Sequence, residues 1–115
     1  MTVIKTKAEN GSTFIVLASF TETLTDGTVA EVIPISVVWS LTDINGQIIN
    51  SRDDVVLTPA ATVAAVCNGN DLLLSDGAER RITFDAVYNS VEFGSSLPLH
   101  QQASFKIDNS FVEEA

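Results

Sequence analysis

The sequence has little of what catalysis usually requires. Its 115 residues include one cysteine and one histidine. A lone cysteine excludes an internal disulfide, which fits a reducing compartment and argues against a small disulfide-stapled secreted domain. Stability must therefore come from a hydrophobic core and from strand pairing.

Basic residues are also scarce, with six Lys and Arg against fifteen Asp and Glu, a formal charge of -9. Such a charge repels phosphate backbones and anionic lipid head groups, which argues against nucleic acid and membranes as partners. The only adjacent basic pair is Arg80-Arg81, and acidic residues flank it. We interpret this pair as a solvated entrance to a strand.

Long apolar runs are missing as well. No stretch approaches the ~20 apolar residues that span a bilayer. The segment Met1 to Lys7 lacks the apolar core and the cleavage site of a secretory signal. We therefore expect a chain that is made in the cytoplasm and stays soluble.

The apolar residues that are present alternate with polar ones. Ile35, Val37, Trp39 and Leu41 recur at every second position, so they share one face of a strand that carries the only tryptophan. An Asn-Gly pair follows, which predicts a hairpin whose return strand is residues 47–52.

Further alternating or short apolar segments predict the remaining strands, with turn residues between them. They are residues 14–20, 55–57, 62–67, 82–88 and 103–107, while 72–74 is either a helical turn or a brief strand. This spacing predicts an all-β domain over residues 1–109, a single immunoglobulin-like or fibronectin-III-like β-sandwich of about seven or eight antiparallel strands, followed by a short acidic tail at 110–115. The predicted core contains Phe14, Phe20, Val37, Trp39, Leu41, Phe84 and Phe105.

Residues with catalytic or metal-binding chemistry are isolated in the sequence. His100 has no nucleophile motif near it, so we interpret it as a surface histidine. Cys67 follows Val63 and Ala65 at strand spacing, which predicts a buried and inert thiol. Carboxylates at turns could collect a calcium ion, but the ligand pattern is incomplete and turn stabilisation is the alternative that we favour; they are Asp43, Asp53, Asp54, Asp71 and Asp76. We predict no enzymatic activity, no cofactor and no metal.

Several segments together resemble small immunoglobulin-like virion proteins of tailed bacteriophages, including head-decoration and tail-associated modules. The segments are Trp39 to Arg52, Asn70 to Leu72, Phe84 to Tyr88 and Ser96 to Leu99, and the resemblance covers roughly residues 13 to 108. It implies a non-enzymatic protein that binds the outside of a capsid or tail and is located in the virion. It transfers no catalytic residue to this chain.

A segment rich in Gly, Ser and Pro, residues 89–99, predicts a longer loop with unusually apolar contents. We predict that Val91, Phe93, Leu97 and Leu99 contact the partner. The alternative is that Phe93 and Leu97 cap the sandwich core. Expected partners are capsid or tail proteins, with a homo-oligomer also possible. The second functional hypothesis is a host-surface or carbohydrate-binding adhesion module, in which sugars stack on exposed aromatic rings.

Overall fold

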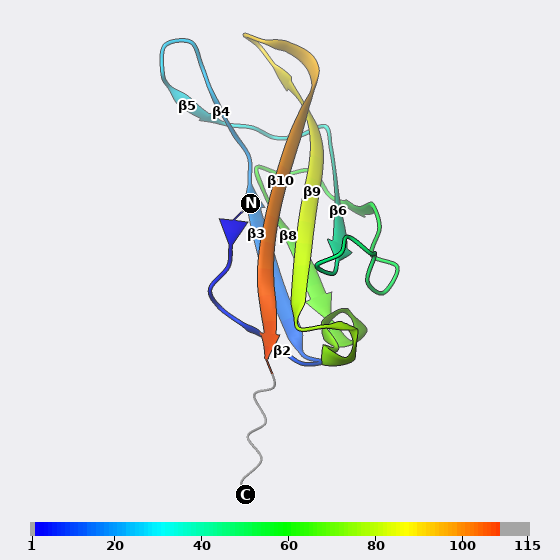
Figure 1. Ribbon diagram of the computed structural model, residues 1–115. Coiled ribbons are helices and arrows are strands. Elements are labelled where there is room, and N and C mark those ends of the chain that lie inside the picture. The colour runs from blue at the N-terminus through cyan, green and yellow to red at the C-terminus, as the bar shows by residue number, and fades with distance from the viewer. Residues whose placement is uncertain (1, 109–115) are drawn as a thin grey trace, which may run out of the picture.

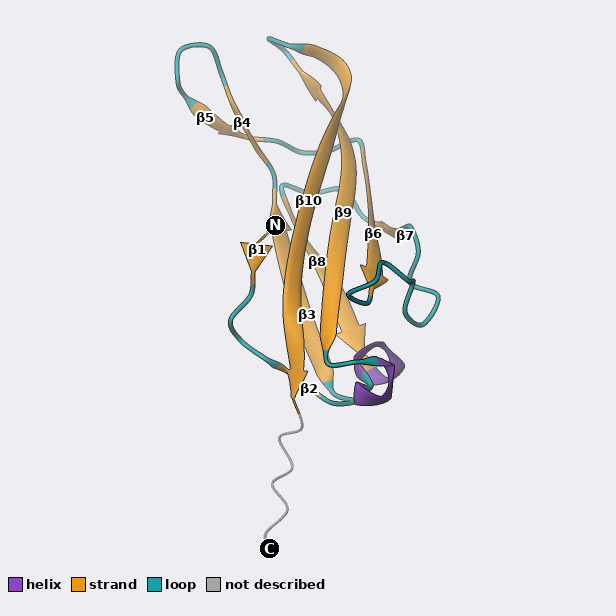
Figure 2. Cartoon of the chain, in the orientation of Figure 1, coloured by secondary structure: helices purple, strands orange, loops and turns teal. Residues whose placement is uncertain are grey.

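The computed structural model describes residues 2–108, which fold into a β-sandwich (Figures 1 and 2). The all-β class predicted from the sequence is confirmed. The strands are β1 (Thr2–Val3), β2 (Ala8–Glu9), β3 (Thr13–Ser19), β4 (Thr21–Thr23), β5 (Val29–Glu31), β6 (Ser36–Thr42), β7 (Val55–Leu57), β8 (Thr62–Asn68), β9 (Glu79–Ser90) and β10 (Gly94–Asp108). Two short 3-10 helices, η1 (Gly69–Leu72) and η2 (Leu74–Asp76), lie between β8 and β9.

The larger sheet has the strand order β1-β10-β9-β6-β7, and β2 also pairs with β10. Most pairs are antiparallel, but β1 and β2 run parallel to β10. Alternation in the sequence reports which face a residue occupies and not the direction of its neighbour, so the parallel pairs were not predicted. The finer immunoglobulin-like assignment stays a prediction.

The smaller sheet consists of β3 and β8, which pair antiparallel without a register shift. Their inward residues pack against those of the larger sheet, where Trp39 is opposite Phe84 in the β6–β9 ladder and is 2% exposed. Of the predicted core residues, Phe14 is partly buried and the others are buried. The alternation in β3, β6, β8 and β9 thus places one face of each strand in a common core.

The segment after β6 does not form the predicted return strand. Asp43 accepts hydrogen bonds from the backbone N–H groups of Asn45 and Gln47, which forms the expected tight turn with Gly46 at φ +83°. The chain beyond it makes an isolated bridge between Thr42 and Ile48. It also makes two backbone hydrogen bonds with Leu41, whose carbonyl accepts from the Ile49 N–H and whose N–H donates to the Arg52 carbonyl, but no ladder forms. Two left-handed residues, at positions 50 and 51, then end the extended conformation. The prediction of a strand over 47–52 is therefore wrong.

The segment 89–99 is not a long loop either. β9 and β10 form one long hairpin in which only residues 91–93 are outside the strands. The Ser90 hydroxyl accepts hydrogen bonds from the N–H groups of Glu92 and Phe93, and this contact closes the turn. The predicted tail at 110–115 lies outside the described residues.

Candidate functional site

Two hairpins extend past one end of the sandwich (Figure 1). β9 and β10 contain 12 and 15 residues, whereas β3 and β8 contain seven each, so the long hairpin continues beyond the smaller sheet. The hairpin of β4 and β5 lies beside it at the same end. We call residues 21–35 and 85–99 together the hairpin end.

The tips of the two hairpins are bonded to each other. The backbone N–H of Thr25 donates to Glu92 Oε1 at 3.1 Å, and the Thr25 hydroxyl donates to the same oxygen. The β4–β5 turn is closed by Asp26, which accepts a hydrogen bond from the Thr28 N–H, while Gly27 has φ +86°. These contacts fix two separate chain segments as one surface.

Large apolar side chains are exposed on this surface. Val91 at the tip is fully exposed, Phe93 is 47% exposed and Val29 is 63% exposed. Ile33 and Ile35 in the connection from β5 to β6 are exposed as well. A group of exposed apolar residues at one end of a domain is typical of a protein interaction site.

The four predicted partner-binding residues divide into two pairs. Val91 and Phe93 lie at the exposed tip, whereas Leu97 and Leu99 lie within β10 and are half-buried. Leu99 packs against the core. Sequence reasoning missed Val29, Ile33 and Ile35, because nothing local to them indicates that β4 and β5 project beyond the sandwich.

The charges of the hairpin end have one sign. It contains five carboxylates and neither lysine nor arginine, so all six basic residues of the chain lie outside it. The carboxylates belong to Glu22, Asp26, Glu31, Asp85 and Glu92. One oxygen of Glu22 is buried without a hydrogen-bond partner in the part of the chain that the structure describes.

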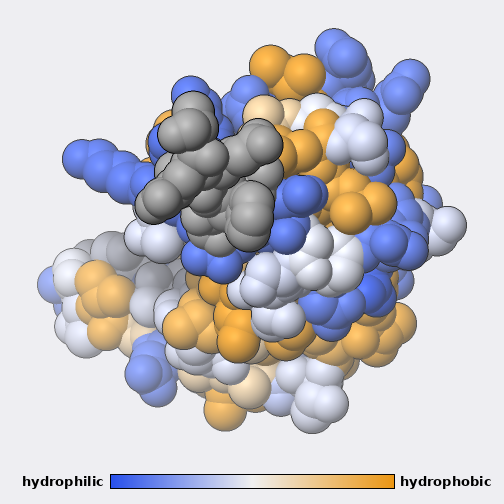
Figure 3. Space-filling view, turned by 90° about the horizontal axis from the view of Figure 1, so that it is seen from below, coloured by the Kyte–Doolittle hydropathy of each residue, from blue (hydrophilic) through white to orange (hydrophobic). Residues whose placement is uncertain are grey.

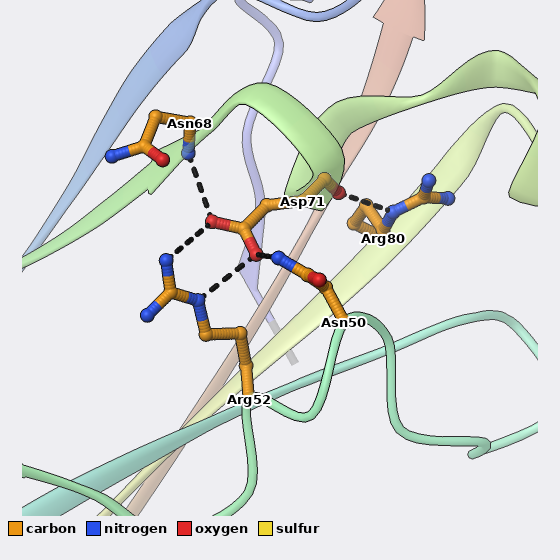
Figure 4. Close-up of polar contacts among 5 residues, drawn as sticks. All are labelled: Asn50, Arg52, Asn68, Asp71 and Arg80. Atoms are coloured by element: carbon orange, nitrogen blue, oxygen red, sulfur yellow. Dashed lines mark hydrogen bonds and ion pairs between the residues drawn. The ribbon is translucent and has the colours of Figure 1, made fainter.

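The opposite end of the molecule has a different organisation. Figure 3 views it directly, and the coloured atoms mix hydrophilic and hydrophobic residues. At this end a polar cluster around the buried Asp71 and Arg80 joins three chain segments (Figure 4). We call the 3-10 helices with this cluster the closed end; the cluster consists of Asn50, Arg52, Asn68, Asp71 and Arg80.

Asp71 is the acceptor at the centre of the cluster. Its carboxylate accepts hydrogen bonds from Nε and one Nη of Arg52, at 2.9 and 3.2 Å. It also accepts hydrogen bonds from the Asn50 side-chain amide and the Asn68 backbone N–H, each at 2.9 Å. Desolvation by burial raises the pKa of this carboxyl, but the hydrogen bonds from Arg52, Asn50 and Asn68 outweigh burial and leave its pKa below the usual value. Arg52 also stacks over Trp39, 5.7 Å from the ring centroid.

Arg80 corrects the prediction of a solvated basic pair. Its side chain is completely buried and donates to backbone carbonyls of Asp71, Leu73, Gly77 and Glu79, at 2.7 to 3.0 Å. The guanidinium group is planar and has five N–H donors, so it can bond several of the carbonyls that are left unpaired where short helical turns end. The acidic neighbours of the Arg80-Arg81 pair suggested exposure, whereas the fold uses Arg80 to hold the connection between β8 and β9.

The polar groups of Asp71 and Arg80 are bonded within the chain. Every oxygen of Asp71 is bonded within the cluster, and the Arg80 donors are directed at backbone. Cys67 beside it is buried, and burial, followed by the nearby Asp71 charge, raises the pKa of its thiol to about 12. We therefore interpret this region as structural.

The other candidate residues are dispersed. His100 Nδ1 lies 2.7 Å from Asp85 Oδ1 on an exposed face, and both side chains are more than half exposed. Asp43 stabilises its own turn and Asp71 pairs with Arg52. Within residues 2–108, no three His, Cys, Asp or Glu side chains are grouped as a metal site. No described helix is long and apolar enough to cross a membrane.

No family model matches this chain, and it matches no curated protein and no solved structure.

Proposed function

We propose that this chain is a non-enzymatic virion structural protein that binds a capsid or tail protein of a tailed phage through its hairpin end. The resemblance described above suggests the kind of particle. The site is suggested by the exposed apolar tips of two mutually bonded hairpins. That observation carries the proposal.

The hairpin tips have the features of an interface centre. Phe93 supplies an aromatic anchor, and Val91 and Val29 supply apolar area beside it. The bond between Thr25 and Glu92 orders the two tips before binding, so little conformational entropy remains to be lost on association. A surface of this kind acts by adhesion.

The charge of the hairpin end supports a partner with a basic surface. Five carboxylates without any basic residue favour a surface that carries lysine and arginine around an apolar recess. A second copy of this end would bring carboxylates against carboxylates, which disfavours self-association here. Steering by these charges weakens as ionic strength rises, because the Debye length shortens to about 3 Å at 1 M salt.

The test uses particles assembled without this chain. The purified full chain is added to them, bound copies are counted after sedimentation, and the particles are imaged with and without it. We expect a fixed stoichiometry, extra density on the capsid or tail, and slower association at high salt. The double variant Val91→Ser and Phe93→Ser should weaken binding about 30-fold, as loss of an interface centre worth ~2 kcal/mol predicts.

A matched control is Val56→Ser, which removes a largely exposed valine from β7, outside the hairpin end. Binding should be unchanged. Particles that bind no chain, or binding that the control weakens as much as the double variant, would contradict the proposal. Binding of purified glycans by the chain, lost in Phe93→Ser, would instead support the carbohydrate-binding alternative.

A further inference from the structure

The smaller sheet contains only two strands, so each strand has one unpaired edge among the described residues. The Phe20 N–H donates to the Ala61 carbonyl, and the Gly69 N–H donates to the Ser12 carbonyl. In the register of the β3–β8 ladder, these two bonds show that the even-numbered residues of β3 form the hydrogen-bonded pairs with β8. The odd-numbered residues therefore direct their N–H and C=O groups away from β8.

These outward groups of β3 are nearly all unpaired. The Ser19 carbonyl accepts a hydrogen bond from the Gln101 side chain at 3.0 Å, which confirms the direction in which the odd-numbered residues face. No described group is bonded to the backbone N–H or C=O of Ile15 or Leu17. The middle of β3 thus presents a strand edge without a neighbour.

A cleft of about 410 Å³ runs beside this edge. Val16, Leu17 and Ala18 form one wall, and the N-terminal segment with β10 forms the other. The cleft exists because β1 pairs with β10 and not with β3, which leaves the smaller sheet one strand short at this position. Strands in a sheet lie about 4.8 Å apart, so one further strand fits beside β3.

The edge lacks the features with which proteins usually prevent strand addition. β3 contains no charged residue, no proline and no glycine, and its ladder has no bulge. No Asp, Glu, Lys or Arg among residues 2–108 lines the cleft, although the chain as a whole carries a charge of -9. Ile4 and Phe84 add apolar surface to it.

We propose that the free edge of β3 binds an extended, uncharged polypeptide segment of a partner protein by antiparallel strand addition. Backbone bonds to Ile15 and Leu17 provide the affinity, and apolar side chains at every second position of the segment enter the cleft. A second copy of this chain fits less well. When the β3 edges of two copies meet, their β1 strands, which lie beside those edges, also approach each other. This site is separate from the hairpin end and does not depend on the function proposed there.

The first experiment measures amide hydrogen exchange of the full chain by NMR. The probe is a synthetic seven-residue peptide of alternating threonine and valine, acetylated and amidated so that it carries no charge. At a peptide concentration about ten times Kd, exchange at Ile15 and Leu17 should slow roughly tenfold. A peptide of the same sequence with N-methylated central residues cannot pair through its backbone and should leave both rates unchanged.

Two proline variants test the direction of the edge. Leu17→Pro removes an N–H that faces away from β8, so the chain should fold and fail to bind the peptide. Val16→Pro removes an N–H of the β3–β8 ladder and should unfold the chain. If Leu17→Pro also unfolds it, the methylated peptide still distinguishes backbone pairing from other contacts.

Three results would overturn the proposal. The peptide could leave both amides unprotected, or it could protect amides of β10 and not of β3. Alternatively, Ile15 and Leu17 could be protected in the free chain with a protection that rises with protein concentration. In that last case the occupant of the edge is a second copy.

Discussion

The two ends of this sandwich differ in how completely their polar groups are hydrogen-bonded within the chain. At the closed end, Asp71 and Arg80 are completely buried and their side chains bond to partners within the chain. At the hairpin end, four of the five carboxylates are exposed beside exposed apolar tips, and the half-buried Glu22 has one buried oxygen without a partner among the described residues. A region whose bonds are complete stabilises the fold, whereas a region with unused apolar surface is available to a partner.

Among changes to polar residues, the largest effect should come from removing the buried guanidinium of the closed end. Arg80→Ala leaves four backbone carbonyls without a donor, so the free energy of unfolding should fall by about 4 kcal/mol in urea denaturation followed by circular dichroism. Arg81→Ala is the matched control. The Arg81 Nε is buried without a hydrogen-bond partner in the described chain, so this change should cost under about 1 kcal/mol. Equal losses would show that the contacts of Arg80 are unimportant.

A somewhat smaller effect is expected for Asp71→Asn, about 3 kcal/mol at pH 7, because Arg52 loses its paired charge. The pKa of Asp71 is lower in the folded protein than in the unfolded chain. Its stabilisation is therefore complete above the unfolded value of about 4 and is lost as pH falls through the folded pKa.

Unfolding at a series of pH values checks this sign. The difference between wild type and Asp71→Asn should shrink below about pH 4. Asp53→Asn, an exposed carboxylate, should change stability by under about 0.5 kcal/mol. A difference that widens in acid would contradict the assignment.

Removing a carboxylate from the hairpin end should stabilise the fold, whereas the same change would destabilise a site whose carboxylate is fully hydrogen-bonded. Glu22→Leu replaces a half-buried carboxylate that has an unpaired oxygen, and we expect stabilisation of about 1 kcal/mol in thermal unfolding. Glu31→Leu alters an exposed carboxylate of the same hairpin and should be nearly neutral. Destabilisation by Glu22→Leu would mean that its carboxylate has a partner.

The smallest effect on folding should come from the residues on which binding depends most. Val91→Ser with Phe93→Ser should change the free energy of unfolding by under about 0.5 kcal/mol, since both side chains are exposed. Phe105→Ala, at a position 1% exposed, should cost about 3 to 5 kcal/mol. A large loss in the double variant would place the tip in the core instead of at an interface.

Local patterns predicted the sandwich well where the pattern and the tertiary environment agree. The alternation around Trp39 and in residues 14–20 identified inward faces, because one side of each strand must leave water. The same reasoning misjudged 89–99. Glycine, serine and proline there suggested a loop, whereas Ser90 closes a turn of three residues and the strands continue around it.

Half of the candidate site was visible in the sequence. Val91 and Phe93 stood out as apolar residues among turn formers, but Val29 belongs to a hairpin, and Ile33 to the connection after it, that local composition cannot place beyond the end of a sheet. Arg80 was misplaced for a related reason. Its surroundings consist of carbonyls from residues 71 to 79, and these converge only after the chain has folded.

The sequence by itself determined that this protein is an all-β domain, since periodic side chains report locally which face of a strand is buried. Tertiary structure alone decided which ends of the strands project, which edge of β3 stays unpaired and which arginine is buried. The first two properties depend on contacts between residues distant in the chain, which no local pattern encodes. The burial of Arg80 depends on carbonyls of residues 71 to 79 that converge only when the two 3-10 helices form.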